Sequence, residues 1–152
     1  MGIELRLGVA RVAVVHAAVE VPHGAGSQLA VAILGEVIAV VEGVDITKED
    51  LPLPVATFIV PFEGKSTPLS RFGAHQPAEQ VYSNTLYVTW FAGGLRAVDF
   101  SNPYQPKEVG YYVPNPGKGQ NVVMSNDVFH DKDGKLYLID RYDGLEILEP
   151  NL

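Results

Sequence analysis

The sequence has no cysteine and few basic residues. Without cysteine the chain can form no disulfide, no thiolate nucleophile and no thiolate metal ligand, so histidine and the carboxylates are the strong ligands that remain. The 18 acidic residues outnumber the 11 lysines and arginines, and the formal charge of -7 leaves no basic surface of the kind that attracts nucleic acid or an anionic membrane. We therefore expect no nucleic acid and no membrane among the partners of this protein.

Long apolar runs are also missing. Residues 1–27 are apolar in places, but charged side chains and His16 interrupt them. No run reaches the roughly 20 residues of a membrane-spanning helix, and this stretch lacks the uninterrupted apolar core of a signal peptide. The sequence therefore predicts a soluble protein, and a cytoplasmic location is the expectation.

What the sequence does contain is a series of short runs rich in Val, Ile, Tyr and Phe, separated by 15 glycines and 11 prolines. This composition favours many short strands. Residues 3–9 alternate apolar and polar side chains, as in a half-buried strand. The runs 29–34 and 37–43 flank Gly35 and Glu36, which predicts a hairpin, with a helix as the alternative because these runs contain several alanines.

Parts of the sequence repeat one another. "NTLYVTWFAGGLRAVDF" (84–100) and "GKLYLIDRYDGLEILE" (134–149) both contain Leu-Tyr, an apolar run, a glycine turn, Gly-Leu and a second apolar run. "VDITKEDLPLPVA" (44–56) and "VDFSNPYQPKEVG" (98–110) both fit V-D-[IF]-[ST]-x4-P-x2-V-[AG]. Together they define a unit of four strands in about 45 residues, which is typical of a β-propeller blade.

The sequence thus predicts an all-β fold built from antiparallel four-stranded blades of a β-propeller, about three of them in this chain. First-blade strands are expected between residues 12 and 21 and at 29–34, 37–46 and 55–60. Second-blade strands are expected near or just before 80–84 and at 86–91, 95–100 and 108–113. Third-blade strands are expected at 126–131, 135–140 and 145–149, with the fourth strand missing.

The sequence is compatible with more than one domain organisation and with more than one way of closing the ring. Residues 1–43 form either a divergent first blade or an unrelated N-terminal segment, and residues 44–152 form the propeller blades. Known propellers close with about four to eight blades. The chain is therefore a partial propeller, or is completed by a homo-oligomer, or forms an open arrangement of sheets with exposed edges. Residues 3–9 are a candidate closing strand for the unfinished last blade. Six apolar side chains are expected to pack between blades: Trp90, Phe100, Tyr111, Tyr112, Tyr137 and Ile147.

From Arg71 to Glu149 the sequence resembles the bacterial β-propeller proteins built from LVIVD repeats. The resemblance is carried by "RFGAHQPAE", the GLR-VD-S-P-P run, "SNDV" and "DRYDGLEILE", which occur in the expected order. It extends more weakly over Val44 to Pro61. It implies a propeller fold rather than a particular reaction. The family is distantly similar to the selenium-binding protein and methanethiol oxidase propellers, whose channels can hold metal.

The histidines are the candidate metal ligands. All four lie in segments that precede the Leu-Tyr strand of their repeat, where the innermost strand of a blade lines the channel. His75 and His130, with His16 or His23, could converge from three blades, and neutral imidazoles suit Zn, Cu, Fe or Ni. Glu79, Asn126 and Asp127 would then act as supporting acceptors or as a general base towards a metal-bound water. The alternative is that these polar residues cap turns and satisfy backbone groups.

Arginines next to the glycine turns are the candidate anion ligands. Arg71, Arg96 and Arg141 could bind an anionic ligand at the channel mouth, or they could pair with Asp99, Asp127, Asp140 or Asp143 between blades. The predicted ligand-binding set is Arg71, Glu79, Asn126, Asp127 and Arg141.

Three functional hypotheses follow. The first is a binding module that takes a small molecule or a protein at the propeller mouth. The second is a metal-dependent oxidative or hydrolytic enzyme that uses the channel histidines. The third is a truncated fragment of a longer propeller without an independent role.

Overall fold

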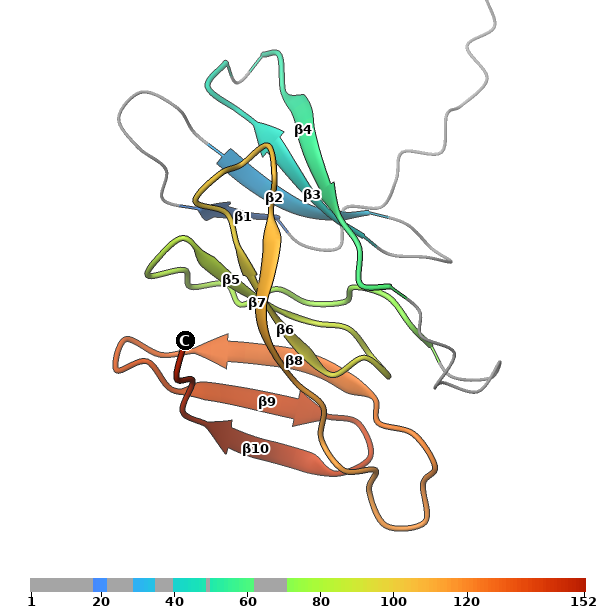
Figure 1. Ribbon diagram of the computed structural model, residues 1–152. Coiled ribbons are helices and arrows are strands. Elements are labelled where there is room, and N and C mark those ends of the chain that lie inside the picture. Colours follow the sequence, from blue (N-terminus) through green and yellow to red (C-terminus); the bar gives the residue numbers. More distant parts are fainter. Residues whose placement is uncertain (1–17, 22–28, 35–39, 49, 62–70) are drawn as a thin grey trace, which may run out of the picture.

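The computed structural model describes residues 18–21, 29–34, 40–48, 50–61 and 71–152, with only the backbone described for the first two of these ranges. The predicted strand at 3–9 and the histidines His16 and His23 lie outside the described residues. The chain forms three antiparallel sheets, which Figure 1 shows one above another. No helix forms in the described part of the chain, so none there is long and apolar enough to cross a membrane. The prediction of an all-β, antiparallel fold is confirmed.

The first sheet contains β1 (Ala18–Val21), β2 (Leu29–Leu34), β3 (Val40–Asp45) and β4 (Leu53–Phe58), paired in chain order. The predicted hairpin of β2 and β3 is confirmed, and the helical alternative is wrong. All six residues of β2 pair with β3, and β1 pairs along its other edge. This double ladder satisfies the backbone groups of β2 and outweighs the helix preference of its two alanines.

The middle sheet contains β5 (Thr85–Thr89), β6 (Leu95–Asp99) and β7 (Lys107–Tyr112). A further extended segment, residues 75–78, lies along the free side of β5. Its amides at His75 and Ala78 donate to the carbonyls of Thr89 and Tyr87, both at 2.8 Å. The middle sheet therefore has a short fourth member, which lies just before the 80–84 stretch of the sequence.

The last sheet contains β8 (Ser125–His130), β9 (Leu136–Asp140) and β10 (Gly144–Leu148). Its order is β10-β9-β8, and no fourth strand of the described residues pairs with β10. As described, the three sheets form an open stack and do not close into a ring (Figure 1).

Two apolar clusters hold the stack together, one on each face of the middle sheet. Alternation along β5 supplies both, because Leu86 and Val88 point towards the first sheet while Tyr87 points towards the last. The cluster between the first and middle sheets contains Val41, Phe58, Val60, Ala74, Leu86, Val88, Trp90, Val98 and Phe100. The cluster between the middle and last sheets contains Ala78, Tyr87, Leu95, Ala97, Val128, Leu136 and Leu138.

The six side chains that were expected to pack between blades differ in their burial. Trp90 and Phe100 are buried as predicted, and Trp90 lies edge-on to Phe58 with ring centroids 5.9 Å apart. For Tyr111 the prediction is wrong, because this side chain is 69% exposed and lies beside the guanidinium of Arg96. Tyr112 is also exposed, while Tyr137 is half-buried and Ile147 exposed on a face that no described sheet covers.

The sequence repeat corresponds to a repeat in geometry. The pairing register shifts between Gly43 and Val44 in the first sheet and between Ala97 and Val98 in the middle sheet, which are aligned positions. The aspartates that follow also match. The Oδ1 atom of Asp45 accepts the amide of Thr47, and that of Asp99 accepts the amide of Ser101, both at 2.8 Å. The V-D-[IF]-[ST] motif therefore encodes a bulge followed by an aspartate-capped turn.

Candidate anion-binding site

Two arginines and a histidine surround one aromatic ring at one end of the sheets. The guanidinium carbons of Arg71 and Arg141 each lie 5.7 Å from the ring centroid of Phe91. The ring of His75 lies 4.4 Å from the same ring, tilted by 47°. We refer to Arg71, His75, Phe91 and Arg141 as the arginine cluster. Its members come from three segments that are far apart in the sequence.

The backbone at Phe91 brings these segments together. Phe91 is the one non-glycine residue of the described chain with a positive φ, at 47°. Its carbonyl accepts the amide of Ser125 at 3.1 Å, and the amide of Ala92 donates to the carbonyl of Arg71 at 3.1 Å. A left-handed residue with a large side chain is uncommon and persists where surrounding contacts hold it in place. Here the turn after β5 is tied to the start of β8 and to the segment that carries Arg71.

A bulge in β8 sets the position of Arg141. The register of β8 against β9 shifts between Ser125 and Asp127, which leaves Asn126 outside the ladder. The freed backbone carbonyl of Asn126 accepts hydrogen bonds from Nδ1 of His75 at 2.6 Å and from Oγ1 of Thr89 at 3.0 Å. Its side-chain Oδ1 accepts a hydrogen bond from Nε of Arg141. One residue therefore orients both the histidine and one arginine of the cluster.

The contact with Asn126 identifies the donor nitrogen of His75. A backbone carbonyl can only accept, so Nδ1 of His75 carries the hydrogen that is donated to Asn126.

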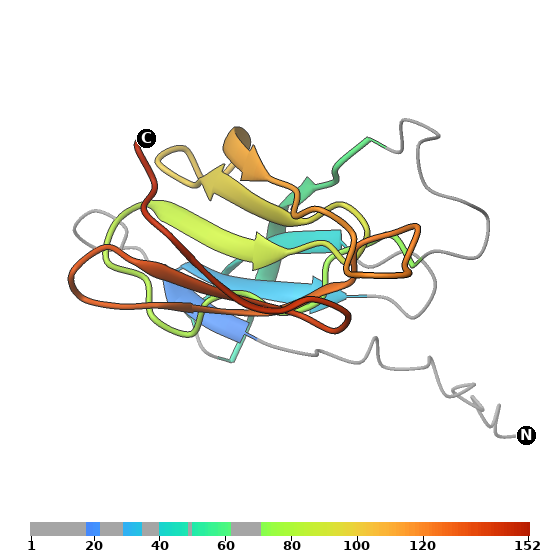
Figure 2. The same cartoon turned by 90° about the horizontal axis from the view of Figure 1, so that it is seen from below.

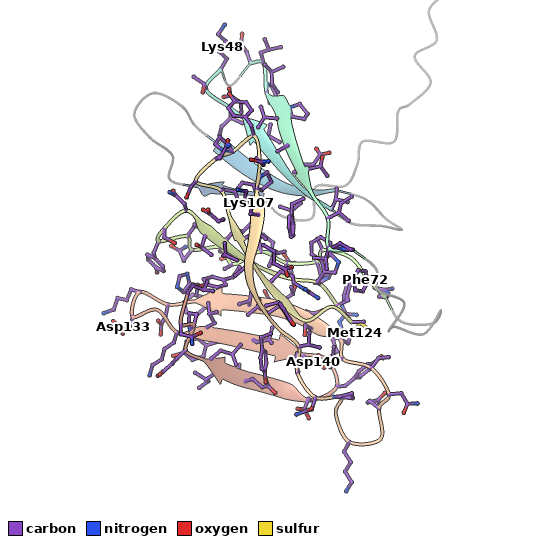
Figure 3. The ribbon with its side chains drawn as sticks, in the orientation of Figure 1. Lys48, Phe72, Lys107, Met124, Asp133 and Asp140 are labelled. Atoms are coloured by element: carbon purple, nitrogen blue, oxygen red, sulfur yellow. The ribbon has the colours of Figure 1, made fainter. Side chains whose placement is uncertain are left out.

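The two arginines of the cluster are exposed, and neither forms a salt bridge with a carboxylate of the described residues. The nearby Asp140 is buried and serves the backbone instead, because its two oxygens accept the amides of Met124 at 2.7 Å and Tyr142 at 2.9 Å. Figure 3 shows Met124, Asp140 and Phe72, which is next to Arg71, at the same end of the sheets. The cluster is therefore a local concentration of positive charge in an acidic protein.

The predicted ligand-binding residues are only partly brought together. Arg71, Asn126 and Arg141 belong to this site, whereas Glu79 and Asp127 do not contact the cluster. Glu79 is exposed, directly after the extended segment 75–78. Asp127 is exposed, and its Oδ1 accepts the amide of the next residue, Val128, at 2.8 Å.

His130 lies away from the cluster. It is four residues after Asn126 on the same strand, about 13 Å further along. Its ring is buried between Tyr82 and Tyr87, with centroids 5.0 Å from each. Desolvation lowers its pKa from the usual 6.5, against the opposing effects of a hydrogen bond to the backbone of Gln80 and of the charge of Asp131.

The structure thus does not bring His75 and His130 together, and no group of three or more metal-ligating side chains forms within the described ranges. His16 and His23 lie outside these ranges, so the predicted histidine metal centre stays a prediction.

Arg96 pairs with a glutamate and not with one of the expected aspartates. Its Nη1 atom pairs with Oε2 of Glu108 across β6 and β7 at 3.2 Å, and its guanidinium lies 5.1 Å from the ring of Tyr111. None of the aspartates proposed as arginine partners forms a salt bridge with an arginine among the described residues. Arg96 therefore contributes to the outer edge of the middle sheet and lies outside the arginine cluster.

Sequence reasoning missed Phe91, the residue at the centre of the site. Its position directly before the Ala-Gly-Gly turn suggested a strand end, and a left-handed backbone at phenylalanine has no sequence signal of its own.

In comparisons with known proteins, no family model matches the chain. No curated protein matches it significantly either.

Proposed function

We propose that this chain is a β-propeller repeat protein that acts as a binding module, and that the arginine cluster is its site for an anionic small molecule. One observation carries the proposal. Two arginines separated by 70 positions in the sequence lie over the same ring, and neither pairs with a carboxylate of the described residues. Such an arrangement leaves both guanidinium groups available to an anion from outside.

The chemistry of the cluster favours a carboxylate or a phosphate. A guanidinium presents donors in a planar fork that matches either group, and both guanidinium groups lie within cation–π distance of the Phe91 ring. Asn126 leaves the terminal nitrogens of Arg141 available, because it accepts from Nε.

The propeller interpretation is supported by the repeated geometry. The first and middle sheets share a bulge and an aspartate-capped turn at aligned positions, and all three sheets stack face to face. In a propeller the innermost strands line a channel, and the loops at their ends form its mouth. Residues 75–78 and β8 are the inner members of their sheets, and the contact from His75 to Asn126 joins them. On this interpretation the arginine cluster lies at the mouth.

Titration calorimetry with inorganic phosphate and with succinate tests the proposal. We expect saturable binding to the wild-type chain, weakened about 10-fold or more by Arg71→Ala and by Arg141→Ala, because hydrogen bonds to charged groups contribute about 1.5–3 kcal/mol. Lys132→Ala is the matched control, since it removes one positive charge from an exposed turn. In Figure 3 its neighbour Asp133 lies at the opposite end of the sheets from the cluster. Absence of saturable binding, or an equal loss in the control, would contradict the proposal.

A further inference from the structure

One face of the last sheet is apolar and uncovered. Cross-strand pairing aligns Phe129, Tyr137 and Ile147 in one row and Asp127, Ile139 and Leu145 in the next. The side chains of Phe129, Ile139, Leu145 and Ile147 are 45% to 60% exposed, and Tyr137 is half-buried. We call these five apolar residues the open face. Figure 2 views the molecule from the side of the last sheet.

The open face corresponds to a face that is buried elsewhere in the chain. In the repeat, Tyr137, Leu145 and Ile147 align with Tyr87, Leu95 and Ala97 of the middle sheet. Those three residues are buried in the cluster that the last sheet covers. The open face is therefore the surface on which each sheet of this repeat receives the next one.

The opposite faces follow the same rule. Leu136 and Leu138 of the last sheet align with Leu86 and Val88 of the middle sheet, and each pair is buried against the preceding sheet. Each sheet thus has a face that looks back and a face that looks forward. What fits the open face is the backward-looking face of another sheet of this repeat.

Within the described residues, the first sheet is the one whose backward-looking face has no preceding sheet. Val41 of β3 is fully buried towards the middle sheet, so Val40, Glu42 and Val44 point to the other side by alternation. Thr57 of β4 pairs with Glu42 and shares this side.

We propose that a second copy of this chain places the backward-looking face of its first sheet on the open face, head to tail, so that two copies form one ring of six sheets. Six lies within the range of about four to eight at which propellers close. Head-to-tail contacts give a finite ring when the rotation between copies closes, and an open filament when it does not. The proposal does not depend on the anion-binding site.

The mass of the chain in solution, measured by light scattering after size exclusion over a wide concentration range, tests the proposal. We expect a particle of twice the 16.5 kDa chain mass. The double variant Leu145→Asp/Ile147→Asp should raise the dissociation constant about 100-fold or more, because it forces unpaired charge into an apolar interface. Both positions are exposed, so the isolated chain should keep its fold, which circular dichroism checks. Tyr104→Asp is the control, because Tyr104 is 69% exposed in the loop between β6 and β7 and lies on neither face.

A second variant distinguishes head-to-tail from face-to-face association. Glu42→Lys/Thr57→Lys alters only the backward-looking face of the first sheet and should also give a monomer. A 1:1 mixture of the two double variants should form a dimer, held by the one interface that is intact in both partners. A wild-type monomer at all concentrations, a dimer that tolerates Glu42→Lys/Thr57→Lys, or oligomers that grow with concentration would each overturn the proposal.

Discussion

At the scale of single residues, two glycines show how neighbouring strands change the role of the same residue. Gly94 and Gly144 occupy aligned turns and have left-handed backbones, with φ of 78° and 93°. A Cβ atom on Gly94 would lie 2.2 Å from the carbonyl oxygen of Tyr112, whereas one on Gly144 would meet nothing within 4 Å. The difference arises because β7 passes beside Gly94 and no described strand takes its place beside Gly144.

Substituting alanine at the two positions should therefore have unequal effects on the free energy of unfolding. Gly144→Ala should cost about 1 kcal/mol, the penalty for a side chain in the left-handed region. Gly94→Ala should cost about 3 kcal/mol, because the clash with the backbone of Tyr112 adds to that penalty. Urea denaturation of both variants measures the difference. Equal losses would show that the carbonyl of Tyr112 moves aside without cost.

His130 should make stability depend on pH near neutrality. Burial lowers its pKa in the folded chain below the value of 6.5 that applies when it is unfolded. Below about pH 6.5 the unfolded chain binds a proton that the folded chain resists, so the free energy of unfolding should fall as the pH decreases through this range. Asp131, whose pKa is lowered from 3.8 chiefly by a hydrogen bond from the backbone of Lys135, titrates at more acidic pH.

Comparing the wild type with His130→Phe isolates this effect. Phenylalanine suits the pocket between Tyr82 and Tyr87 and does not titrate. Urea denaturation at about pH 7.5 and 5.5 should therefore show a smaller loss of stability in the variant than in the wild type. A loss of the same size in both proteins would assign the pH dependence to other groups.

At the scale of elements, the bulge in β8 links the frame of the last sheet to the arginine cluster. Asn126 contacts both Arg141 and His75, so in the proposed anion site it is a positioning residue. Asn126→Asp keeps the acceptor for Arg141 but adds a negative charge next to it. We expect phosphate affinity to fall about 10-fold while the free energy of unfolding changes little.

The neighbouring residue provides the control for this prediction. Asp127→Asn changes the charge by one unit at the next position, on a side chain that belongs to the row of Ile139 and Leu145. It should leave phosphate affinity unchanged in the same titration. If Asp127→Asn strengthens binding by as much as Asn126→Asp weakens it, the effect is a general one of charge and does not pass through Arg141.

Most strands were predictable because a local signal specifies each of them. The repeated apolar runs and the glycine turns between them predicted β5, β6, β9 and β10 to within about two residues. The short inner segment at 75–78 has no such pattern, since its pairing with β5 is made by backbone atoms of an irregular stretch that contains Pro77.

The candidate site was predictable only in part. Proximity to glycine turns indicated Arg71 and Arg141, but it indicated Arg96 equally well. What separates them is a cross-strand partner, since Glu108 faces Arg96 and no described carboxylate pairs with the other two. Pairing of this kind depends on the register of β6 against β7 and on the stacking of the sheets, which a repeat pattern does not specify.

At the scale of the whole molecule, the stack predicts a gradient of local stability. β5 and β6 are covered on both faces, whereas β10 has one uncovered face and one unpaired edge among the described strands. In the Leu145→Asp/Ile147→Asp variant, which should be monomeric, backbone amides of β5 and β6 should therefore exchange with deuterium more slowly than those of β10, by roughly 100-fold. Exchange measured by mass spectrometry or NMR checks this. Equal protection of β10 and β6 in this monomeric variant would contradict the predicted gradient.

The open face also separates two of the sequence-based hypotheses. A chain that forms a defined dimer has completed its apolar surface, whereas a fragment of a longer propeller exposes that surface and tends to aggregate. The solution mass proposed above therefore bears on whether the chain acts independently. The metal-dependent enzyme remains a separate hypothesis, to be tested by metal analysis of protein that was purified without chelator.

The position of Trp90 has a practical consequence for spectroscopy. It is the chain's one tryptophan, and it lies between the first and middle sheets with Phe58 and Phe72 at its edges. Its indole N–H is buried without an acceptor among the described residues, so its emission should be blue-shifted as in an apolar solvent. The interface between the middle and last sheets contains tyrosine and no indole. Tryptophan fluorescence will therefore report when the first two sheets separate and remain silent when the last sheet detaches.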